Sequence, residues 1–400
     1  MRIIMVFCTA QVLAQLGGFT FAALLPEFLA DWSLSHSQAG WLSGIFFGAY
    51  ALSVPFLVTL TDRIPARSIY LFAVVLTAFS HVGMATLADQ FWSGMIFRAL
   101  AGIGWAGTYM VGLRALTDEM SGASQSRAVA ANAASIGISG ALSFVLAGQL
   151  QTAFGWPAAF LLAAVCSVAA LVIAWVWFPR RAPPPAATQG LFDFRPVLAN
   201  RSAIAYSLGY CAHTWEMFVL RSWGVTYLVF ALATDGTRVN WLIPTVIAML
   251  MELVGTVSSV AGNEMALRIG RQRWILIVMC VSMVGASTLG FISSFGYWAA
   301  AGACLLYNAA VYADSSALTA GAVGSAKPER KGATMAVHAL LGYSGGFVGP
   351  LTMGILLDTL GGESVLSWGL GFVHVAVIMF LGPAALLLLR PRDLAGDGPN

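Results

Sequence analysis

The sequence predicts an all-α integral membrane protein with twelve transmembrane helices, arranged as two six-helix bundles. Three observations lead to this fold class: the composition, twelve apolar runs of spanning length, and a repeat that relates the two halves of the chain. Of the 400 residues, 59% are hydrophobic and 9% are charged, and the mean hydropathy is +0.81. Soluble domains carry about 25% charged residues, so the composition excludes a water-soluble globule.

Polar and charged breaks divide the chain into twelve apolar runs, each long enough for the roughly 20 residues that cross a bilayer. The first run is interpreted as a transmembrane helix, because a cleaved signal peptide has a shorter apolar core. An even number of spans places both termini on the same side. The predicted spans are residues 4–30, 38–60, 68–88, 91–115, 127–151, 157–178, 202–230, 241–266, 274–294, 297–322, 332–357 and 364–389.

The positions of lysine and arginine predict the orientation of these spans. Of the 20 basic residues, sixteen lie at the termini or in connections from an even run to the next odd run, and one, Arg238, lies in an odd-to-even connection. The other three are inside runs. Because basic residues gather in cytoplasmic loops, we expect a multi-pass protein of the cell (inner) membrane with both termini in the cytoplasm.

The longest connection is rich in proline and charge and separates the first six runs from the last six. We therefore predict an N-terminal bundle at residues 1–178, a cytoplasmic linker at 179–201, and a C-terminal bundle with a short cytoplasmic tail at 202–400. Three short matches repeat at one offset of about 205 residues, which indicates a duplicated six-helix unit. They pair Arg63–Arg67 with Arg268–Arg271, Arg127 with Lys331, and Ser139-Gly140 with Ser344-Gly345.

Short motifs in these segments resemble those of the major facilitator superfamily, and the resemblance extends over essentially the whole chain. The segment Asp62-Arg-Ile-Pro-Ala-Arg67 is similar to the Asp-Arg-x-Gly-Arg-Arg signature of that family, although Pro65, Ala66 and Val58 depart from it. Its second copy keeps Arg-x-Gly-Arg at residues 268–271, with Glu264 as the acidic member. Arg98 begins an Arg-x-x-x-Gly-x-Gly motif in the fourth run.

The resemblance implies two bundles related by a pseudo-two-fold axis along the membrane normal, which alternate access to a solute site near mid-membrane. It also implies that the first, fourth, seventh and tenth helices line the cavity. The alternative for the charged inside loops is a role in orientation alone. The predicted gate residues are Asp62, Arg63, Arg67, Glu264, Arg268 and Arg271.

The seventh run carries three ionisable residues, His213, Glu216 and Arg221, in an otherwise apolar stretch. At 100° per residue, they fall with Thr214 on one arc of about 160°. A charged group near the bilayer centre costs roughly 2.5 to 3.5 kcal/mol on insertion scales, so such groups usually mark a solute or proton path. The alternative is a Glu–Arg pair that only fixes helix packing, but a spacing of five residues is poor for such a pair.

Other polar residues fall on the helices that would line the cavity. They are predicted to bind solute together with Arg221, whose rigid fork of donors suits a carboxylate or similar oxyanion. For the aromatic members, packing or anchoring at the lipid interface is the alternative. The predicted solute-binding residues are Arg221, Arg98, Gln11, Gln15, Trp105, Tyr109, Tyr307 and Asn308.

Three carboxylates lie deep in the runs against two deep arginines, Arg98 and Arg221, which leaves one excess negative charge if all are ionised. A carboxylate without a partner in such a site can take up and release a proton as the cavity opens to either side. Glu216 is the first choice as proton carrier and Asp314 the second. Glu252 is either a third carrier or the partner in a buried pair, and His213 is expected to bond to Glu216.

The sequence therefore predicts a secondary active transporter that moves a small, anionic solute by proton-coupled alternating access. A proton-coupled exporter of cationic or amphipathic drugs is the alternative, although the fifth run lacks the Gly-Pro pair typical of such antiporters. A sensor, a membrane enzyme and a channel are more distant alternatives. We expect a monomer whose partners are the solute, protons and the lipid bilayer. We expect no cofactor, metal or nucleic acid, since the five cysteines form no ligand pattern and no basic patch is interleaved with aromatics.

Overall fold

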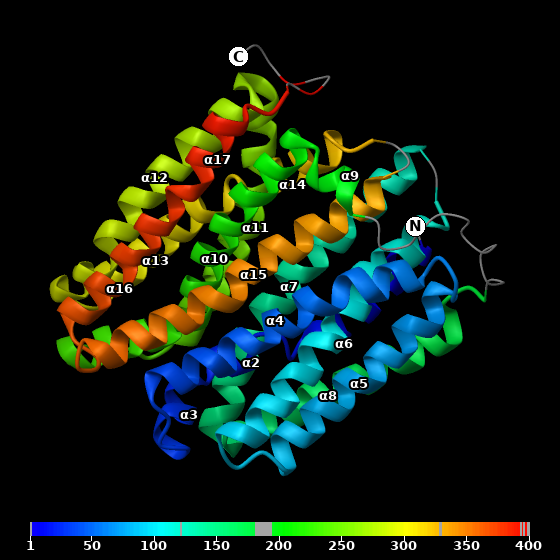
Figure 1. Ribbon diagram of the computed structural model, residues 1–400. Coiled ribbons are helices and arrows are strands. Elements are labelled where there is room, and N and C mark those ends of the chain that lie inside the picture. Colours follow the sequence, from blue (N-terminus) through cyan, green and yellow to red (C-terminus); the bar gives the residue numbers. More distant parts are fainter. Residues whose placement is uncertain are drawn as a thin grey trace. The chain divides into compact units, whose positions relative to one another are not determined.

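A computed structural model describes residues 2–120, 122–180, 194–327 and 330–392, together with Leu394 and Asp397. The elements of this part of the chain are helices (Figure 1). By length and composition, ten helical segments within it are able to cross a membrane. The expectation of an all-α membrane protein is confirmed, and ten of the twelve predicted runs correspond to single spanning segments.

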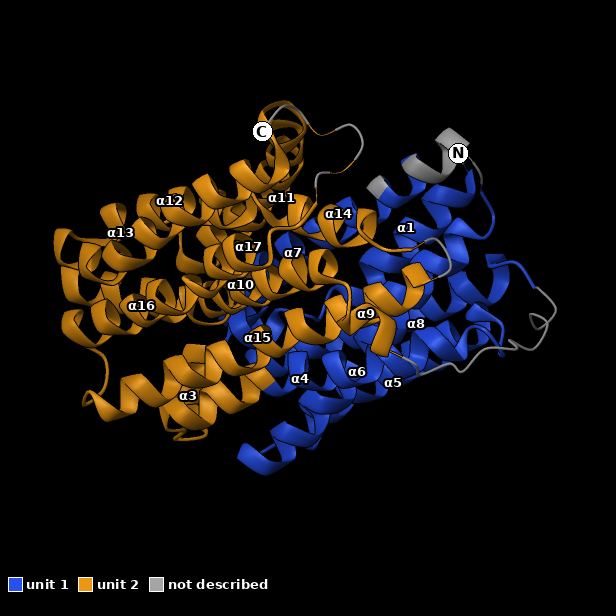
Figure 2. Cartoon of the chain, turned by 45° about the horizontal axis from the view of Figure 1, so that its top comes forward, with its two compact units in different colours: residues 1–24, 45–191 blue, residues 25–44, 192–400 orange. Residues whose placement is uncertain are grey.

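The chain forms two compact units, coloured separately in Figure 2. Unit 1 comprises residues 1–24 and 45–191, and unit 2 comprises residues 25–44 and 192–400. The division at 178 and 202 stays a prediction, since residues 181–193 of the predicted linker lie outside the described residues. The grouping of residues 25–44 with unit 2 was not expected from the sequence.

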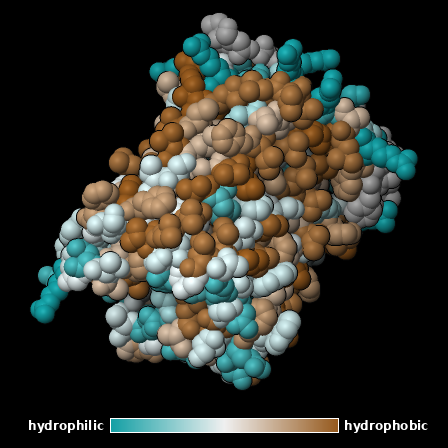
Figure 3. All heavy atoms as spheres, turned by 60° about the vertical axis from the view of Figure 1, so that its left-hand side comes forward, coloured by the Kyte–Doolittle hydropathy of each residue, from teal (hydrophilic) through white to brown (hydrophobic). Residues whose placement is uncertain are grey.

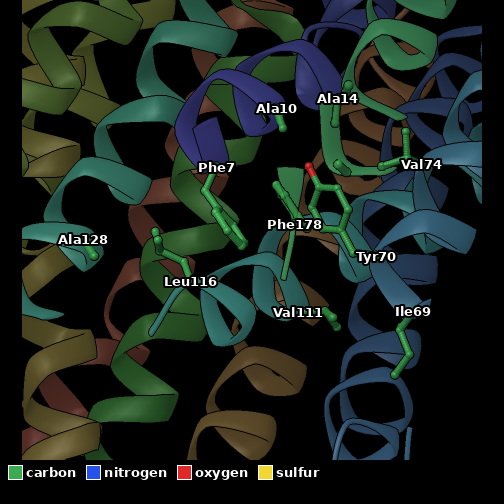
Figure 4. Packing of buried hydrophobic residues seen from close by; sticks show 12 residues of the cluster. Phe7, Ala10, Ala14, Ile69, Tyr70, Val74, Val111, Leu116, Ala128 and Phe178 are labelled. Atoms are coloured by element: carbon green, nitrogen blue, oxygen red, sulfur yellow. The ribbon is translucent and has the colours of Figure 1, made fainter. Parts of the chain in front are cut away.

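Unit 1 is built around a core of apolar side chains from five of its helices. Figure 4 shows Phe7, Tyr70 and Phe178 among them. The rings of Phe7 and Phe178 stack with centroids 3.7 Å apart, and Tyr70 lies 4.9 Å from Phe178. The helices are α1 (Arg2–Gln15), α2 (Thr20–Ala23), most of α4 (His36–Leu60), α5 (Ala66–Thr86), α6 (Phe91–Thr117), α7 (Gly122–Phe154) and α8 (Trp156–Trp177). The core side chains come from α1, α5, α6, α7 and α8.

Unit 2 is organised around α10 (Arg201–Asp235), which packs against most of the other long helices of the unit. The Asn200 side chain caps its first turn by accepting a hydrogen bond from the Ala203 amide, and Gly236 ends it at φ +67°. The other elements are α3 (Leu25–Asp31), α9 (Arg195–Leu198), α11 (Pro244–Ile269), α12 (Arg271–Ile292), the 3₁₀ turn η1 (Ser293–Phe295), α13 (Tyr297–Tyr312), α14 (Ser315–Gly324), α15 (Lys331–Thr359), α16 (Val365–Met379) and α17 (Leu381–Leu389).

Many large apolar side chains point outward, as lipid contact requires. Phe56 of α4 and Phe79 of α5 are exposed in unit 1, and Val257 of α11 and Leu306 of α13 are exposed in unit 2. The face drawn in Figure 3 carries broad hydrophobic areas. Soluble monomers rarely expose patches of this extent, so these surfaces support the membrane assignment.

The predicted run at residues 4–30 is not one helix, because the chain turns at residues 16–19 between α1 and α2. Gly17 sits there against the His81 ring, and a Cβ atom on it would come within 2.8 Å of the Ala163 Cβ. The amide of Phe19, freed by the break, donates to Ser143 Oγ at 3.2 Å. A freed amide must find such a partner within a bilayer, so α7 stabilises the break.

The predicted run at residues 297–322 is broken as well, between α13 and α14 at Ala313 and Asp314. The Ala313 carbonyl accepts a hydrogen bond from Trp274 Nε1 at 2.9 Å. Gly262 passes close to the same backbone, since a Cβ atom there would lie 2.9 Å from the Ala313 Cα. Asp314 therefore stands at the N-cap of α14 (Ser315–Gly324), at the break of a discontinuous helix, a feature that lines ion and solute sites in transporters.

Candidate functional site

The ionisable residues predicted in the seventh run all lie in the middle of α10 and are buried within unit 2. His213 and Glu216 are 0% and 1% exposed, and the Arg221 side chain is 8% exposed. Buried charges require partners or protonation. The partners come from α11, α12, α13 and the start of α14.

Arg221 is held by Glu252 of α11 and Tyr312 of α13. Its Nε donates to Glu252 Oε1 at 2.6 Å, and its Nη2 donates to both Glu252 Oε2 and the Tyr312 hydroxyl. The guanidinium also lies 5.6 Å from the centre of the Phe218 ring and 5.6 Å from that of Tyr312. This two-point geometry is the strongest form of an Arg–carboxylate pair, and it supports the reading of Glu252 as a buried pair partner.

Glu216 is held in a different way, by hydroxyl groups. The Tyr307 hydroxyl donates to Glu216 Oε1 at 2.8 Å, and Ser282 Oγ donates to Glu216 Oε2 at 3.2 Å. No ion pair to Glu216 is found in the described part of the chain. A buried carboxylate bonded only to neutral donors carries a charge at high cost and accepts a proton readily.

His213 faces Asp314 at the break between α13 and α14. Its Nδ1 lies 2.9 Å from Asp314 Oδ1, an ion-pair distance, but the angles are outside those of a hydrogen bond. An aspartate at the first position of a helix normally caps it, yet no side-chain cap bond is found for α14. The Asp314 carboxylate faces His213 instead, so a contact with α10 replaces the usual N-cap hydrogen bond.

The structure corrects one predicted contact and gives Asn308, which was predicted to bind solute, a partner in the helix packing. His213 was expected to bond to Glu216, but Asp314 is the carboxylate beside it, because Glu216 points to α12 and α13. Asn308 donates to the Met251 carbonyl at 2.6 Å, so its amide joins α13 to α11. Sequence reasoning missed Ser282 and assigned no role to Tyr312. The signal of each is a polar group in an apolar run.

In unit 1, the predicted glutamines are buried with unsatisfied amides. Gln11 and Gln15 are 1% and 2% exposed. Among the described residues, neither polar atom of the Gln15 amide has a hydrogen-bond partner, and the Gln11 Nε2 has none either. Buried polar groups normally find partners, so these amides are candidates for contact with water or solute.

The other predicted residues of unit 1 form an aromatic cluster on α6. The Arg98 guanidinium lies over the rings of Phe21 and Phe46, at 4.9 and 4.6 Å. Trp105 contacts Phe46 at 5.1 Å and Tyr109 at 6.4 Å between ring centroids. These three residues of α6 are therefore packed against aromatic neighbours.

The predicted gate residues of unit 1 lie at one end of α4 to α6. Asp62 Oδ1 forms an ion pair with Arg114 Nη1 at 2.7 Å, and Arg67 donates to the Trp175 carbonyl at 2.7 Å. A hollow of about 190 Å³ is lined by residues that include Arg67 and Arg114. Arg63 is exposed, so its side chain takes no part in this cluster.

The predicted gate residues of unit 2 are only partly brought together. Arg271 is buried and pairs with Asp397 through two contacts, at 2.8 and 3.2 Å, and it also reaches the Ala317 carbonyl. Glu264 and Arg268 are exposed, and within the described ranges neither forms an ion pair. The acidic partner of Arg271 is thus Asp397, which the motif did not indicate.

Comparison with known proteins places these features in a family. The model of the Major Facilitator Superfamily matches residues 7–350. The hexuronate transporter of Bacillus subtilis (strain 168) is 23% identical over 422 aligned positions, covering 99% of this chain and 97% of that protein. Human protein spinster homolog 1 is 22% identical over 239 positions, covering 57% of the chain and 45% of the relative. The chain thus matches less than half the length of its spinster relatives.

Solved structures agree on the fold. A bacterial homologue of the human lysosomal transporter Spinster, in an inward-facing and occupied conformation, aligns with TM-score 0.77 at 16% identity, covering 100% of this chain and 98% of that one. The POT family transporter PepTSo aligns with TM-score 0.79 at 12% identity, covering 98% and 99%. With the family model matching most of its length, this multi-pass membrane protein belongs to the Major Facilitator Superfamily.

Proposed function

We propose that the protein is a secondary active transporter that moves a small anionic solute across the cell membrane by proton-coupled alternating access. The observation that carries this proposal is the buried two-point pair of Arg221 with Glu252, close along α10 to a second carboxylate, Glu216, that only hydroxyls hold. We also propose that the chain acts as a monomer with both termini in the cytoplasm.

The balance of charge supports proton binding. Three buried carboxylates, Glu216, Glu252 and Asp314, lie in unit 2 with the buried Arg221 and His213. The buried Arg271 has its own partner, Asp397, and does not enter this balance. Glu252 neutralises Arg221, so Glu216 and Asp314 remain with only hydroxyls and an imidazole. An isolated charge in a low-dielectric site is costly. A change in the partners of Glu216 or Asp314 during transport would therefore lead that carboxyl group to take up or release a proton.

Arg221 supports an anionic solute. Its guanidinium fork matches a carboxylate in geometry, and Glu252 now occupies the position that a solute carboxylate would take. We propose that a proton bound by Glu252 frees the fork for the solute, and that Glu216 carries the transported proton. Glu252 would then return to Arg221 once the solute leaves, so that the guanidinium is never buried without a counter-charge.

The solute class is proposed to be a hydroxylated carboxylate such as a sugar acid. The nearly full-length similarity to a hexuronate transporter supports this class. In unit 1, Gln11 and Gln15 offer buried amides without partners, and an amide both donates to and accepts from hydroxyl groups. On α6, Trp105 and Tyr109 supply apolar faces, and Arg98 is proposed to assist in solute binding.

Uptake by proteoliposomes tests the proposal. The purified protein is reconstituted, a pH gradient is imposed, and uptake of radiolabelled glucuronate is compared with that of an uncharged sugar and of a lipophilic drug cation. We expect gradient-driven uptake of glucuronate that Arg221→Gln abolishes. Arg238→Gln, which removes an exposed arginine, is the matched control and is expected to retain uptake. Transport of the drug cation alone would overturn the proposal in favour of the exporter.

A further inference from the structure

The segment at residues 25–44 is tied to the end of α15 by a polar contact that the proposed transport site does not use. Asp358 accepts from the backbone amides of His36 and Ser37, at 3.0 and 2.8 Å, and so caps the first turn of α4. The His36 ring adds two contacts: its Nδ1 lies 2.9 Å from Asp358 Oδ1, and its Nε2 lies 3.6 Å from Glu363 Oε1.

Each ring nitrogen of His36 therefore faces a carboxylate oxygen. A neutral imidazole has one N–H and one lone pair, whereas the imidazolium has two N–H groups. Both contacts are attractive only in the protonated form, since the neutral ring presents a lone pair to one of the two carboxylates. The N-terminus of a helix opposes a positive charge, but two carboxylates within 3.6 Å outweigh this effect.

The backbones are in close contact at the same place. A Cβ atom on Gly40 would lie 2.7 Å from the Pro350 carbonyl oxygen and 2.9 Å from the Leu351 Cα, and Gly354 is pressed against the His36 backbone. Trp223 Nε1 donates to the Pro350 carbonyl at 2.9 Å. Glycines at these positions thus allow the backbone of residues 25–44 to approach that of α15 closely. These contacts contain no titratable group and do not depend on pH.

Solvent reaches the polar contact. The side chains of His36, Asp358 and Glu363 are 20%, 29% and 27% exposed. Residues 31–37 and 358–363 fall in odd-to-even connections, which the distribution of basic residues predicts to face away from the cytoplasm. The pH outside the cell is therefore the pH that this histidine would sense.

We propose that His36, Asp358 and Glu363 form a pH-sensitive clamp that holds residues 25–44 against α15 at acidic external pH and loosens as the pH rises. The sign follows from the charges: the clamp is strongest while His36 is protonated and both carboxylates are ionised. Histidine changes charge between about pH 5 and pH 8, and carboxylates near about pH 4. The clamp therefore weakens as the pH rises through the range in which the histidine loses its proton. In an alternating-access cycle, acid would favour the state in which this contact is made.

Distance measurements between spin labels test the clamp without any solute, so they are independent of the proposed function. The full chain is reconstituted in nanodiscs with its native cysteines replaced, and labels are placed at the exposed positions Asp31 and Thr359. Raising the pH from about 5.5 to about 8.5 is expected to shift the distances toward longer values in one step. His36→Gln is expected to remove the step, whereas His374→Gln, which changes a histidine of α16, keeps it.

A second variant keeps the test decisive if His36→Gln does not fold. Glu363→Gln removes one carboxylate in an exposed connection. Less negative charge then remains to stabilise the imidazolium of His36, so the step is expected at lower pH. A step that persists unchanged in His36→Gln, or an unmoved midpoint in Glu363→Gln, would overturn the proposal. So would distances in the unmodified protein that do not depend on pH.

Discussion

The two units each bury an arginine, and they hold it in different ways. In unit 1, the Arg98 guanidinium lies over the faces of Phe21 and Phe46. In unit 2, Arg221 donates hydrogen bonds to the Glu252 carboxylate and the Tyr312 hydroxyl. An aromatic face holds a cation without any proton to exchange, whereas a carboxylate titrates. We therefore propose that the ionic switch lies in unit 2, where the partner of the arginine is a carboxylate.

Other buried polar groups of the two units sharpen this comparison. Unit 1 buries the amides of Gln11 and Gln15, and its helix α6 carries the stacked rings of Trp105 and Tyr109. Unit 2 buries the carboxyl groups of Glu216 and Asp314, with His213 beside the latter. Both units also contain a broken helix, but Ser143, an uncharged group, satisfies the break in unit 1, whereas an aspartate stands at the break in unit 2.

The largest expected effect comes from breaking the Arg221–Glu252 pair. Glu252→Gln leaves the Arg221 guanidinium buried without a counter-charge, which costs about 3 to 5 kcal/mol. We expect a clear fall in the midpoint of thermal unfolding of the detergent-solubilised protein. The double variant Arg221→Gln with Glu252→Gln removes both charges and is expected to recover most of that loss. A Glu252→Gln variant as stable as the unmodified protein would show that the pair is not formed.

The next effect tests the proposal that Glu216, whose partners are the hydroxyls of Tyr307 and Ser282, exchanges a proton. Glu216→Gln is expected to lower gradient-driven uptake by about tenfold or more, while solute exchange without a gradient continues. Asp31→Asn, at an exposed carboxylate of α3, serves as the control and is expected to change neither rate. Equal losses of driven uptake and of exchange would assign Glu216 to solute binding instead of coupling.

A smaller effect is expected from Tyr307→Phe, which removes the hydroxyl that donates to Glu216. One hydrogen bond contributes about 1 kcal/mol, so driven uptake is expected to fall by roughly fivefold. Tyr227→Phe removes a buried hydroxyl of α10 that donates to the Leu289 carbonyl. Both variants should lose similar stability, but only Tyr307→Phe should change uptake, and equal uptake in the two would argue against a role for Tyr307 in coupling.

The smallest effect is expected at the break between α13 and α14. Trp274→Phe keeps an aromatic ring but removes the indole N–H that satisfies the Ala313 carbonyl. The loss is expected to be about 0.5 to 1.5 kcal/mol, measured as a modest drop in the thermal midpoint. Unchanged stability would mean that another donor satisfies this carbonyl.

The sequence predicted the helices well where hydropathy alone decides them. The predicted spans at 68–88 and 91–115 correspond to α5 (Ala66–Thr86) and α6 (Phe91–Thr117), within a few residues. The breaks in the first and tenth runs were not predicted, because a turn stabilised by another helix leaves hydropathy unchanged. The signals available were the Gly17-Gly18 pair and the lone Asp314.

The partners within the site were harder to predict. The expectation that Arg221 and Glu216 serve separate tasks, drawn from their spacing, agrees with their separate partners. Glu252 lies 31 positions from Arg221 and Tyr312 lies 91, so helix packing alone decides that they meet. The gate motif similarly indicated Arg271 but not Asp397, which lies 126 positions away.

The measurement that tests the central claim most directly is an infrared pH titration of the protein in lipid. The carbonyl stretch of a protonated carboxyl group reports proton binding by Glu216, and it requires neither a known solute nor a gradient. The account predicts a band in the unmodified protein that grows as the pH falls and is missing in Glu216→Gln. Identical spectra for the two proteins over the whole titration would contradict the claim that Glu216 carries the proton.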